Sequence, residues 1–110
     1  MAYDESLAMR VRDALADEQG VSERNMFGGL CLMLHGHMVC GVVRDELMLR
    51  VAPDQHELLV RLPHAREMDF TGRPSRGMVY VGVEGIAEDD DLRSWLERGL
   101  AVAGSLPPKS

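Results

Sequence analysis

Three short apolar runs, separated by tight turns, limit the fold of this chain more than any other feature. They occupy residues 30–34, 38–43 and 47–51. Gly36 can take the positive φ of a type II′ turn, so we expect a β-hairpin with Gly36 and His37 as its loop. The turn at 44–46 leads into the third strand. Runs this apolar predict strands that are covered on both faces, and we expect helices to supply that cover.

Three helices are expected around these strands. The first is predicted over about 4–18, with Asp4 as its N-cap and an apolar stripe of Leu7, Val11 and Leu15. Pro53 suits the first turn of a second helix over about 54–61. The third opens with acids that meet the positive end of the helix dipole, and the apolar row on its inner side follows. The acids are Glu88, Asp89, Asp90 and Asp91, and the inner row is Leu92, Leu96, Leu100 and Ala103.

The segment between the second and third helices has strand character at both ends. Residues 66–70 are expected to be extended, and residues 78–81 form a run of apolar β-formers. Residues 71–77 carry turn chemistry at every position, which predicts a loop between two strands. No repeat or linker interrupts residues 4–104. We therefore expect one α+β domain.

Length and charge narrow the class of protein. A chain of 110 residues has room for one domain. Its 18 Asp and Glu against 12 Lys and Arg give a net charge of −6, which argues against direct nucleic-acid binding because such domains normally carry a basic footprint. No secretory-signal pattern occurs and no apolar run is long enough to span a bilayer. We expect a cytoplasmic protein with no membrane contact.

Two cysteines and two histidines gather within ten residues, as Cys31, His35, His37 and Cys40. Thiolates and imidazoles are the ligands that zinc or copper favours. With Gly36 and His37 as the hairpin loop, both cysteines share one sheet face on a diagonal beyond disulfide reach. No C-x₂₋₄-C knuckle is present. The favoured interpretation is buried cysteines acting as small hydrophobic residues, and the alternative is a small metal- or ligand-binding domain that uses these four side chains.

Catalytic signals are absent from the sequence. Desolvation among Leu, Met and Val would raise the pKa of both thiols, which opposes a nucleophilic role. We find no G-x-S-x-G, G-x-x-x-x-G-K-[ST], H-E-x-x-H or G-x-G-x-x-G motif. The acids of the third helix are explained by the helix N-terminus. We expect no catalytic residues, no enzymatic activity and no cofactor.

Two glycine-containing segments are candidates for partner contact. In residues 71–77 two arginines bracket a proline between glycines, and such loops can hold an anion or an acidic side chain. The other interpretation is a plain strand connection with solvated arginines. Residues 26–29 are explained first as a strand entry that needs small residues and second as a docking patch. The candidate interaction surface consists of Met26, Phe27, Gly28, Gly29, Gly72, Arg73 and Arg76.

Several motifs together resemble one known family. They are M-A-Y-D-E at 1–5 with Leu7, M-F-G-G-L at 26–30, G-V-V at 41–43, L-M-L-R-V at 47–51, M-D-F-T-G-R-P at 68–74, G-M-V-Y-V at 77–81, and Trp95. In this order and spacing, over about residues 3–108, the chain resembles the TfoX (Sxy) N-terminal domain family. The resemblance implies an α+β fold with an antiparallel sheet packed by helices, similar to type III secretion chaperones.

The same resemblance implies a role. Its members are related to regulators of bacterial competence for DNA uptake, which work with the cyclic-AMP receptor protein at promoters. Those regulators carry a second, C-terminal domain, so we expect this chain to be a stand-alone N-terminal module. The resemblance transfers no catalytic residues. We expect a non-enzymatic regulatory or protein-interaction module with a protein partner, and we favour a homodimer because a sheet this small leaves edges to cover.

Overall fold

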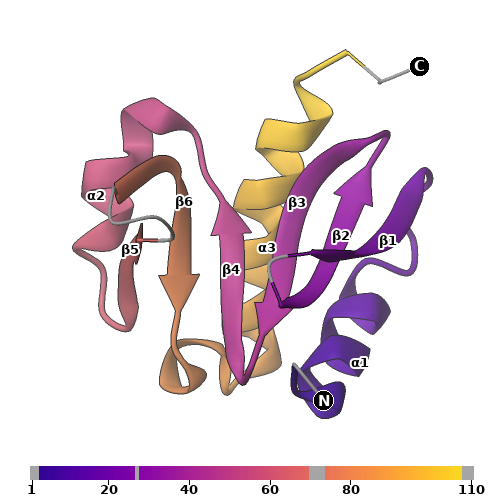
Figure 1. Ribbon diagram of the computed structural model, residues 1–110, viewed down its shortest axis with the longest axis horizontal. Coiled ribbons are helices and arrows are strands. Elements are labelled where there is room, and N and C mark those ends of the chain that lie inside the picture. Colours follow the sequence, from indigo (N-terminus) through magenta and orange to yellow (C-terminus); the bar gives the residue numbers. More distant parts are fainter. Residues whose placement is uncertain (1–2, 27, 70–73, 108–110) are drawn as a thin grey trace.

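A six-stranded antiparallel sheet forms the frame of the molecule, in the order β1-β2-β3-β4-β6-β5 (Figure 1). The computed structural model describes residues 3–26, 28–69 and 74–107. The fold is a single α+β domain, as the sequence predicts. The strands are β1 Val21–Met26, β2 Gly29–Leu34, β3 His37–Val43, β4 Glu46–Arg50, β5 Ala65–Asp69 and β6 Pro74–Val81.

Three α-helices accompany the sheet, as expected: α1 Glu5–Ala14, α2 His56–Val60 and α3 Asp89–Gly104. The Asp4 side chain caps α1, accepting a 3.0 Å hydrogen bond from the backbone N–H of Leu7. Helix α1 is shorter than the predicted 4–18. Short 3₁₀ turns, η1 Pro53–Gln55 and η2 Val83–Ile86, precede α2 and α3. Helix α3 begins at Asp89, within the run of acids from Glu88 to Asp91 where its start is predicted from the sequence.

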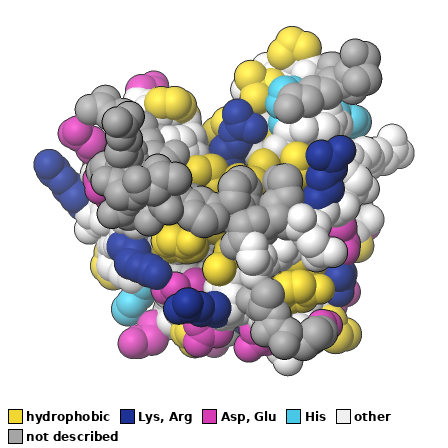
Figure 2. Space-filling model, in the orientation of Figure 1, with side chains coloured by type: hydrophobic (Ala, Val, Ile, Leu, Met, Phe, Trp, Pro, Cys, Tyr) yellow, Lys and Arg dark blue, Asp and Glu magenta, His cyan; other side chains and the backbone are white. Residues whose placement is uncertain are grey.

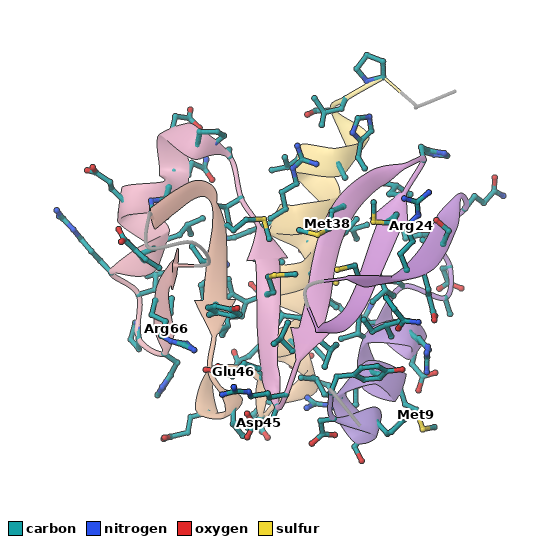
Figure 3. All side chains as sticks on the ribbon, viewed as in Figure 1. Met9, Arg24, Met38, Asp45, Glu46 and Arg66 are labelled. Carbon is teal, nitrogen blue, oxygen red and sulfur yellow. The ribbon has the colours of Figure 1, made fainter. Side chains whose placement is uncertain are left out.

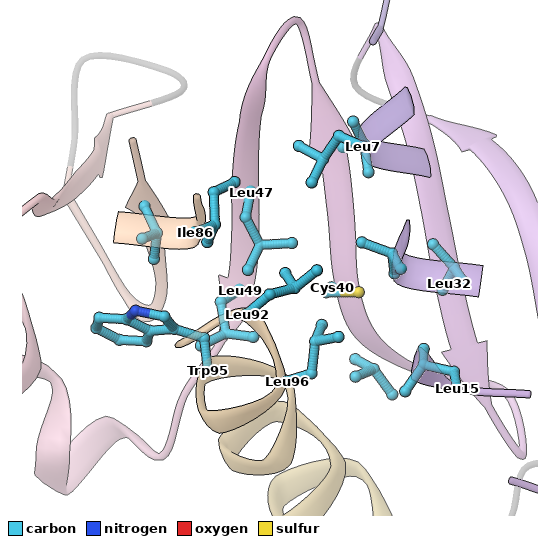
Figure 4. Packing of buried hydrophobic residues seen from close by; sticks show 14 of the residues in the cluster. Leu7, Leu15, Leu32, Cys40, Leu47, Leu49, Ile86, Leu92, Trp95 and Leu96 are labelled. Carbon is cyan, nitrogen blue, oxygen red and sulfur yellow. The ribbon is translucent and has the colours of Figure 1, made fainter. Parts of the chain in front are cut away.

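The main hydrophobic core lies between the helices and one face of the sheet (Figure 4). Helix α1 contributes Leu7 to it and is followed by Leu15 at its C-cap, α3 contributes Leu92, Trp95 and Leu96, and α2 contributes Leu59. They pack on side chains of the central strands, chiefly Leu32, Cys40, Leu47, Leu49 and Val79. In the described part of the chain, none of the helices has the length and hydropathy required to cross a bilayer.

The other face of the sheet carries a second, sulfur-rich cluster. Cys31, Met33 and Met48 are buried there, and Met38, Val43, Met78 and Tyr80 pack against them. The expectation that helices cover both faces is wrong for the described residues, because the buried apolar side chains of all three α-helices belong to the main core. The strands look apolar on both sides because methionine and cysteine fill the helix-free side.

Strand β1 was not predicted from the sequence. Its sequence is V-S-E-R-N-M, and residues 22–25 are exposed. β1 is an edge strand that pairs only with β2 among the described strands. The strand is therefore held by its backbone hydrogen bonds to β2, because its exposed residues form no apolar face. Without an alternation of apolar and polar residues, the sequence gives no sign of this strand. In Figure 1 β1 lies next to β2, at the end of the sheet opposite β5.

The β2–β3 hairpin differs by one residue from its prediction. Leu34 pairs with His37, so the loop is His35 and Gly36 rather than Gly36 and His37. Both loop residues have positive φ, 50° and 88°, as a type I′ turn requires, instead of the expected type II′ turn. A register shift follows between Leu32 and Met33. The extra residue of such a bulge changes which side chains share a face.

Candidate functional site

The shifted register separates the two cysteines. Cys31 pairs with Gly41 and lies in the sulfur-rich cluster, whereas Cys40 pairs with Leu32 and lies in the main core. The prediction that both thiols share one sheet face is therefore wrong. The bulge is the physical reason, since moving a strand by one residue turns its side chains to the opposite face. Both cysteines are free and buried.

The chemistry of the hairpin opposes metal binding. Burial raises the pKa of both thiols, and the neighbouring Cys31 raises that of Cys40 further. His35 lies in the exposed turn, and His37 donates from Nε2 to the carbonyl oxygen of Pro107 at 2.6 Å. The four side chains of the alternative site do not converge. Within residues 3–26, 28–69 and 74–107, no group of three His, Cys, Asp or Glu side chains is placed to hold an ion.

The two glycines at the start of β2, Gly28 just before it and Gly29 as its first residue, have structural explanations. Gly28 has a φ of 74°, a conformation that favours glycine. A Cβ atom at Gly29 would overlap the carbonyl oxygen of Val42 on β3, so the close approach of two strands requires glycine there. This agrees with the interpretation of residues 26–29 as a strand entry. Met26 ends β1, and Phe27 lies outside the described residues.

The second half of the candidate interaction surface lies elsewhere on the sheet. Gly72 and Arg73 lie outside the described residues. The prediction that Arg76 belongs to a loop is wrong, because β6 already begins at Pro74. Gly77 accepts a 2.9 Å hydrogen bond from the N–H of Val51, just beyond the end of β4. The register places Gly29 level with the opposite end of β4, so the described backbone does not bring the two segments together.

An ion pair joins three neighbouring strands near the β5 edge. Arg66 of β5 donates to both carboxylate oxygens of Glu46 on β4, at 2.6 and 3.0 Å. Its guanidinium carbon lies 4.6 Å from the ring centroid of Tyr80 on the intervening strand β6. Figure 3 shows Arg66 directed towards the start of β4. Because these charges neutralise each other, the ion pair of Arg66 stabilises the sheet and leaves little net charge for a partner protein to bind.

A groove opens where α2 and the C-terminal end of α3 stand apart. It has a volume of about 610 Å³ and is lined by residues from 50–59 and 98–106 together with Gly77. We name it the α2–α3 groove. Two arginines, Arg50 and Arg98, line it. The sequence analysis missed this groove, because its walls come from segments far apart in the chain and no short motif joins them.

Comparison with protein families matches residues 13–103 to the model of the TfoX N-terminal domain. The match covers most of the chain, and it includes every strand and the whole of α3 except its final residue. No curated protein and no solved structure matches.

Proposed function

Because the chain belongs to the TfoX N-terminal domain family, we propose that it is a non-enzymatic regulatory module that acts by binding another protein. The family match over residues 13–103 carries this proposal. The structure supports it through two features. The thiols are buried with raised pKa values, and two arginines line the α2–α3 groove.

We further propose that the module is an accessory to transcription control in the cytoplasm, as in the competence regulators that the family includes. The net charge of −6 favours contact with a protein over direct contact with DNA phosphates. A regulator that binds a DNA-binding protein needs no basic surface of its own. The candidate interaction surface supplies the first residues to test.

Affinity capture from the native host, followed by quantitative mass spectrometry, tests the proposal. We expect one defined protein to be enriched over a tag-only control. Changing both Arg73→Ala and Arg76→Ala should weaken its capture at least about fivefold, the scale of losing one or two charged contacts. The matched control changes Arg61→Ala and Arg93→Ala, two exposed arginines outside the candidate surface.

The outcomes separate the general role from the assigned residues. If the wild-type chain enriches no protein, the role in protein binding is wrong. If the partner binds the Arg73→Ala, Arg76→Ala variant as well as the wild type, these two arginines are not part of the contact surface. Equal loss in the control variant would show a general effect of charge.

We also propose that two copies associate through a sheet edge. The edge strand β1 presents exposed polar residues, Ser22 to Asn25, and its outer backbone groups have no partner strand in the described part of the chain. Light scattering after size-exclusion chromatography should give twice the chain mass, and Asn25→Pro should reduce it to the monomer value. A monomer at all concentrations would contradict the dimer.

A further inference from the structure

The α2–α3 groove exists because two helices on one sheet face pack over different strands. Helix α2 contacts β5 and β6, whereas α3 contacts β3 and β4. The space between them is not filled at the end where α3 finishes. Its volume of about 610 Å³ lies within the range of known binding pockets, roughly 300–1,000 Å³. Figure 2 shows the notch in the outline there, with a basic side chain above hydrophobic surface.

The groove has an apolar lining, and Gly77 is a position in that lining without a side chain. Val51 and Leu59 are buried, and Val102 and Leu106 are half-buried along its walls. Val79 and Val81 on β6 face the main core, so position 77 faces the same side. A Cβ atom at Gly77 would meet no described atom within 4 Å. The strand therefore offers bare backbone to the groove, which leaves room for an apolar side chain from outside.

The groove is also positively charged in an otherwise acidic protein. Arg50 and Arg98 line it, and no Asp or Glu is among its described lining residues. Arg98 is held with its guanidinium carbon 4.9 Å from the Trp95 ring centroid. The ion pairs of the described residues use Arg10, Arg12 and Arg66. Among the described residues neither Arg50 nor Arg98 forms an ion pair. Arg98 comes from α3 on the main-core side, whereas Arg50, two residues after Met48, belongs to the sulfur-rich face and lies at the rim of the groove.

The helix dipole of α3 acts against this charge but is smaller. Its C-terminal end, at the groove, carries roughly half a negative elementary charge, against one full positive charge on each arginine. The terminal carbonyls are also occupied, since Ser105 donates from its backbone N–H to Ala101 and from Oγ to Val102. The net charge that an incoming group meets is positive.

From these observations we propose that the α2–α3 groove docks a segment of a partner protein that carries an apolar side chain close to a carboxylate. The apolar side chain occupies the space over Gly77, and the carboxylate pairs with the guanidinium of Arg98 on α3. A groove open along the surface suits a peptide whose main chain stays outside. This inference rests on the proposed function, which requires a protein partner. It adds the surface at which that partner binds and the kind of side chains that the partner presents there.

A charge-swap pair at one exposed position tests this inference. Ala101 lies on the groove wall, on the exposed side of α3. Ala101→Glu and Ala101→Lys add side chains of similar length and helix propensity with opposite charges. Gly77→Leu fills the space over β6 from the strand, at a position with ordinary φ. Far-UV circular dichroism confirms the fold of each variant, and the Ala101 pair suffices if Gly77→Leu does not fold.

The probe is a phage library of random peptides of about 12 residues, selected on the immobilised wild-type chain. We expect enriched peptides with Asp or Glu within about three positions of Leu, Ile, Met or Phe. A synthetic peptide from the selection, measured by fluorescence anisotropy, should bind Ala101→Glu and Gly77→Leu at least about tenfold more weakly. Its affinity for Ala101→Lys should equal or exceed that for the wild type.

Several results would overturn the inference. One is no enrichment over a bare surface, and another is enrichment of peptides without acids. A third is equal binding to Ala101→Glu and Ala101→Lys. Saturable binding of dodecanoate in the groove with no peptide enriched would identify a small amphiphile as the occupant. Loss of dimer mass in both groove variants would identify a second copy instead.

The failure of this inference is distinguishable from that of the proposed function. If host capture of the partner is unchanged in Ala101→Glu and Gly77→Leu, the groove is not its docking site while the role in protein binding stands. If the wild-type chain captures no host protein, the proposed function fails whatever peptides the library yields.

Discussion

The surroundings of single residues in this molecule depend on the register in which neighbouring strands pair. Cys31 and Cys40 lie on strands that pair directly, yet they face opposite sides of the sheet because of one bulge. Cys40 is completely buried and Cys31 nearly so, with 0% and 1% of their surfaces exposed. Each thiol is therefore a packing group in a different cluster.

The thiols provide a prediction at this scale. Burial raises the pKa of both, so the reactive thiolate is scarce and shielded. In the native protein at neutral pH, we expect a disulfide reagent that releases a coloured thiol to react at least about 100-fold more slowly than in denaturant, where both thiols titrate. Rapid reaction of one thiol in the folded protein would contradict the buried placement of that cysteine.

The Arg12–Glu23 ion pair gives a second residue-scale prediction. Arg12 donates to both oxygens of Glu23, at 2.7 and 2.9 Å, and holds the pKa of Glu23 below its ordinary value of 4.5. Because both side chains are more than a third exposed, water screens the pair, and Glu23→Gln should lower the free energy of unfolding at pH 7 by only about 0.2–1 kcal/mol.

The pH dependence of that difference has a definite sign. A carboxylate whose pKa is lowered on folding stabilises the native state above pH 4.5, and the contribution disappears as pH falls through the lowered pKa. The free energies of unfolding of the wild type and Glu23→Gln, measured in urea, should therefore converge as the pH falls below 4.5 through the lowered pKa. Glu18→Gln, at an exposed acid, is the control. A difference that persists at low pH would show that the substitution acts by another route.

At the scale of elements, the seating of α3 on β3 decides the shape of the core. Gly99 faces the sheet, and a Cβ atom there would lie 2.6 Å from the carbonyl oxygen of Val39. Helix and strand thus approach more closely than an alanine allows. The inner row predicted from the sequence is correct for Leu92, Leu96 and Ala103, which are buried, whereas Leu100 is half-buried. The close approach at Gly99 was not apparent from the apolar pattern.

A pair of glycine substitutions in α3 tests this seating. Alanine is preferred to glycine in a helix by about 1 kcal/mol, but overpacking at a core contact costs about 1–3 kcal/mol. We expect Gly99→Ala to lower the free energy of unfolding. At Gly104 a Cβ atom meets only ordinary contact, 3.9 Å from Leu34, so Gly104→Ala should leave stability unchanged or slightly higher. Urea denaturation measures both, and a stable Gly99→Ala would contradict the close seating.

At the scale of the whole molecule, one core joins both ends of the chain. The main core includes Leu7 from α1 and Ala103 from α3, with the central strands between them. Arg10 also ties these ends together, donating to the carbonyl oxygen of Ile86 at 2.7 Å and to Asp89 at 3.0 Å. Among the described residues, helices from both halves of the chain therefore bury their apolar side chains in the same core.

Cooperative unfolding is the prediction that follows. The single tryptophan, Trp95, lies in the main core, so its fluorescence reports the packing of α3. In urea, the fluorescence transition and the far-UV circular dichroism transition should coincide, as in two-state domains of this size. A fluorescence change that precedes the loss of secondary structure would show that α3 detaches first and that the core is divided.

The sequence by itself determined the features that depend on near neighbours along the chain. These are the α+β class, the Asp4 cap, the acids that open α3, and the three central strands. Each is set by local propensity, capping or periodicity, which act over a few residues. The strand-entry role of Gly28 and Gly29 was predictable for the same reason.

Only the tertiary structure decided the rest. Strand β1 forms because β2 supplies its hydrogen-bond partners. The two cysteines face opposite sides of the sheet because of one bulge. All described α-helices pack on the same face of the sheet. Arg50 and Arg98 meet at one groove because α2 and α3 pack over different strands. These outcomes depend on register and on contacts between distant segments, and no window of neighbouring residues contains that information.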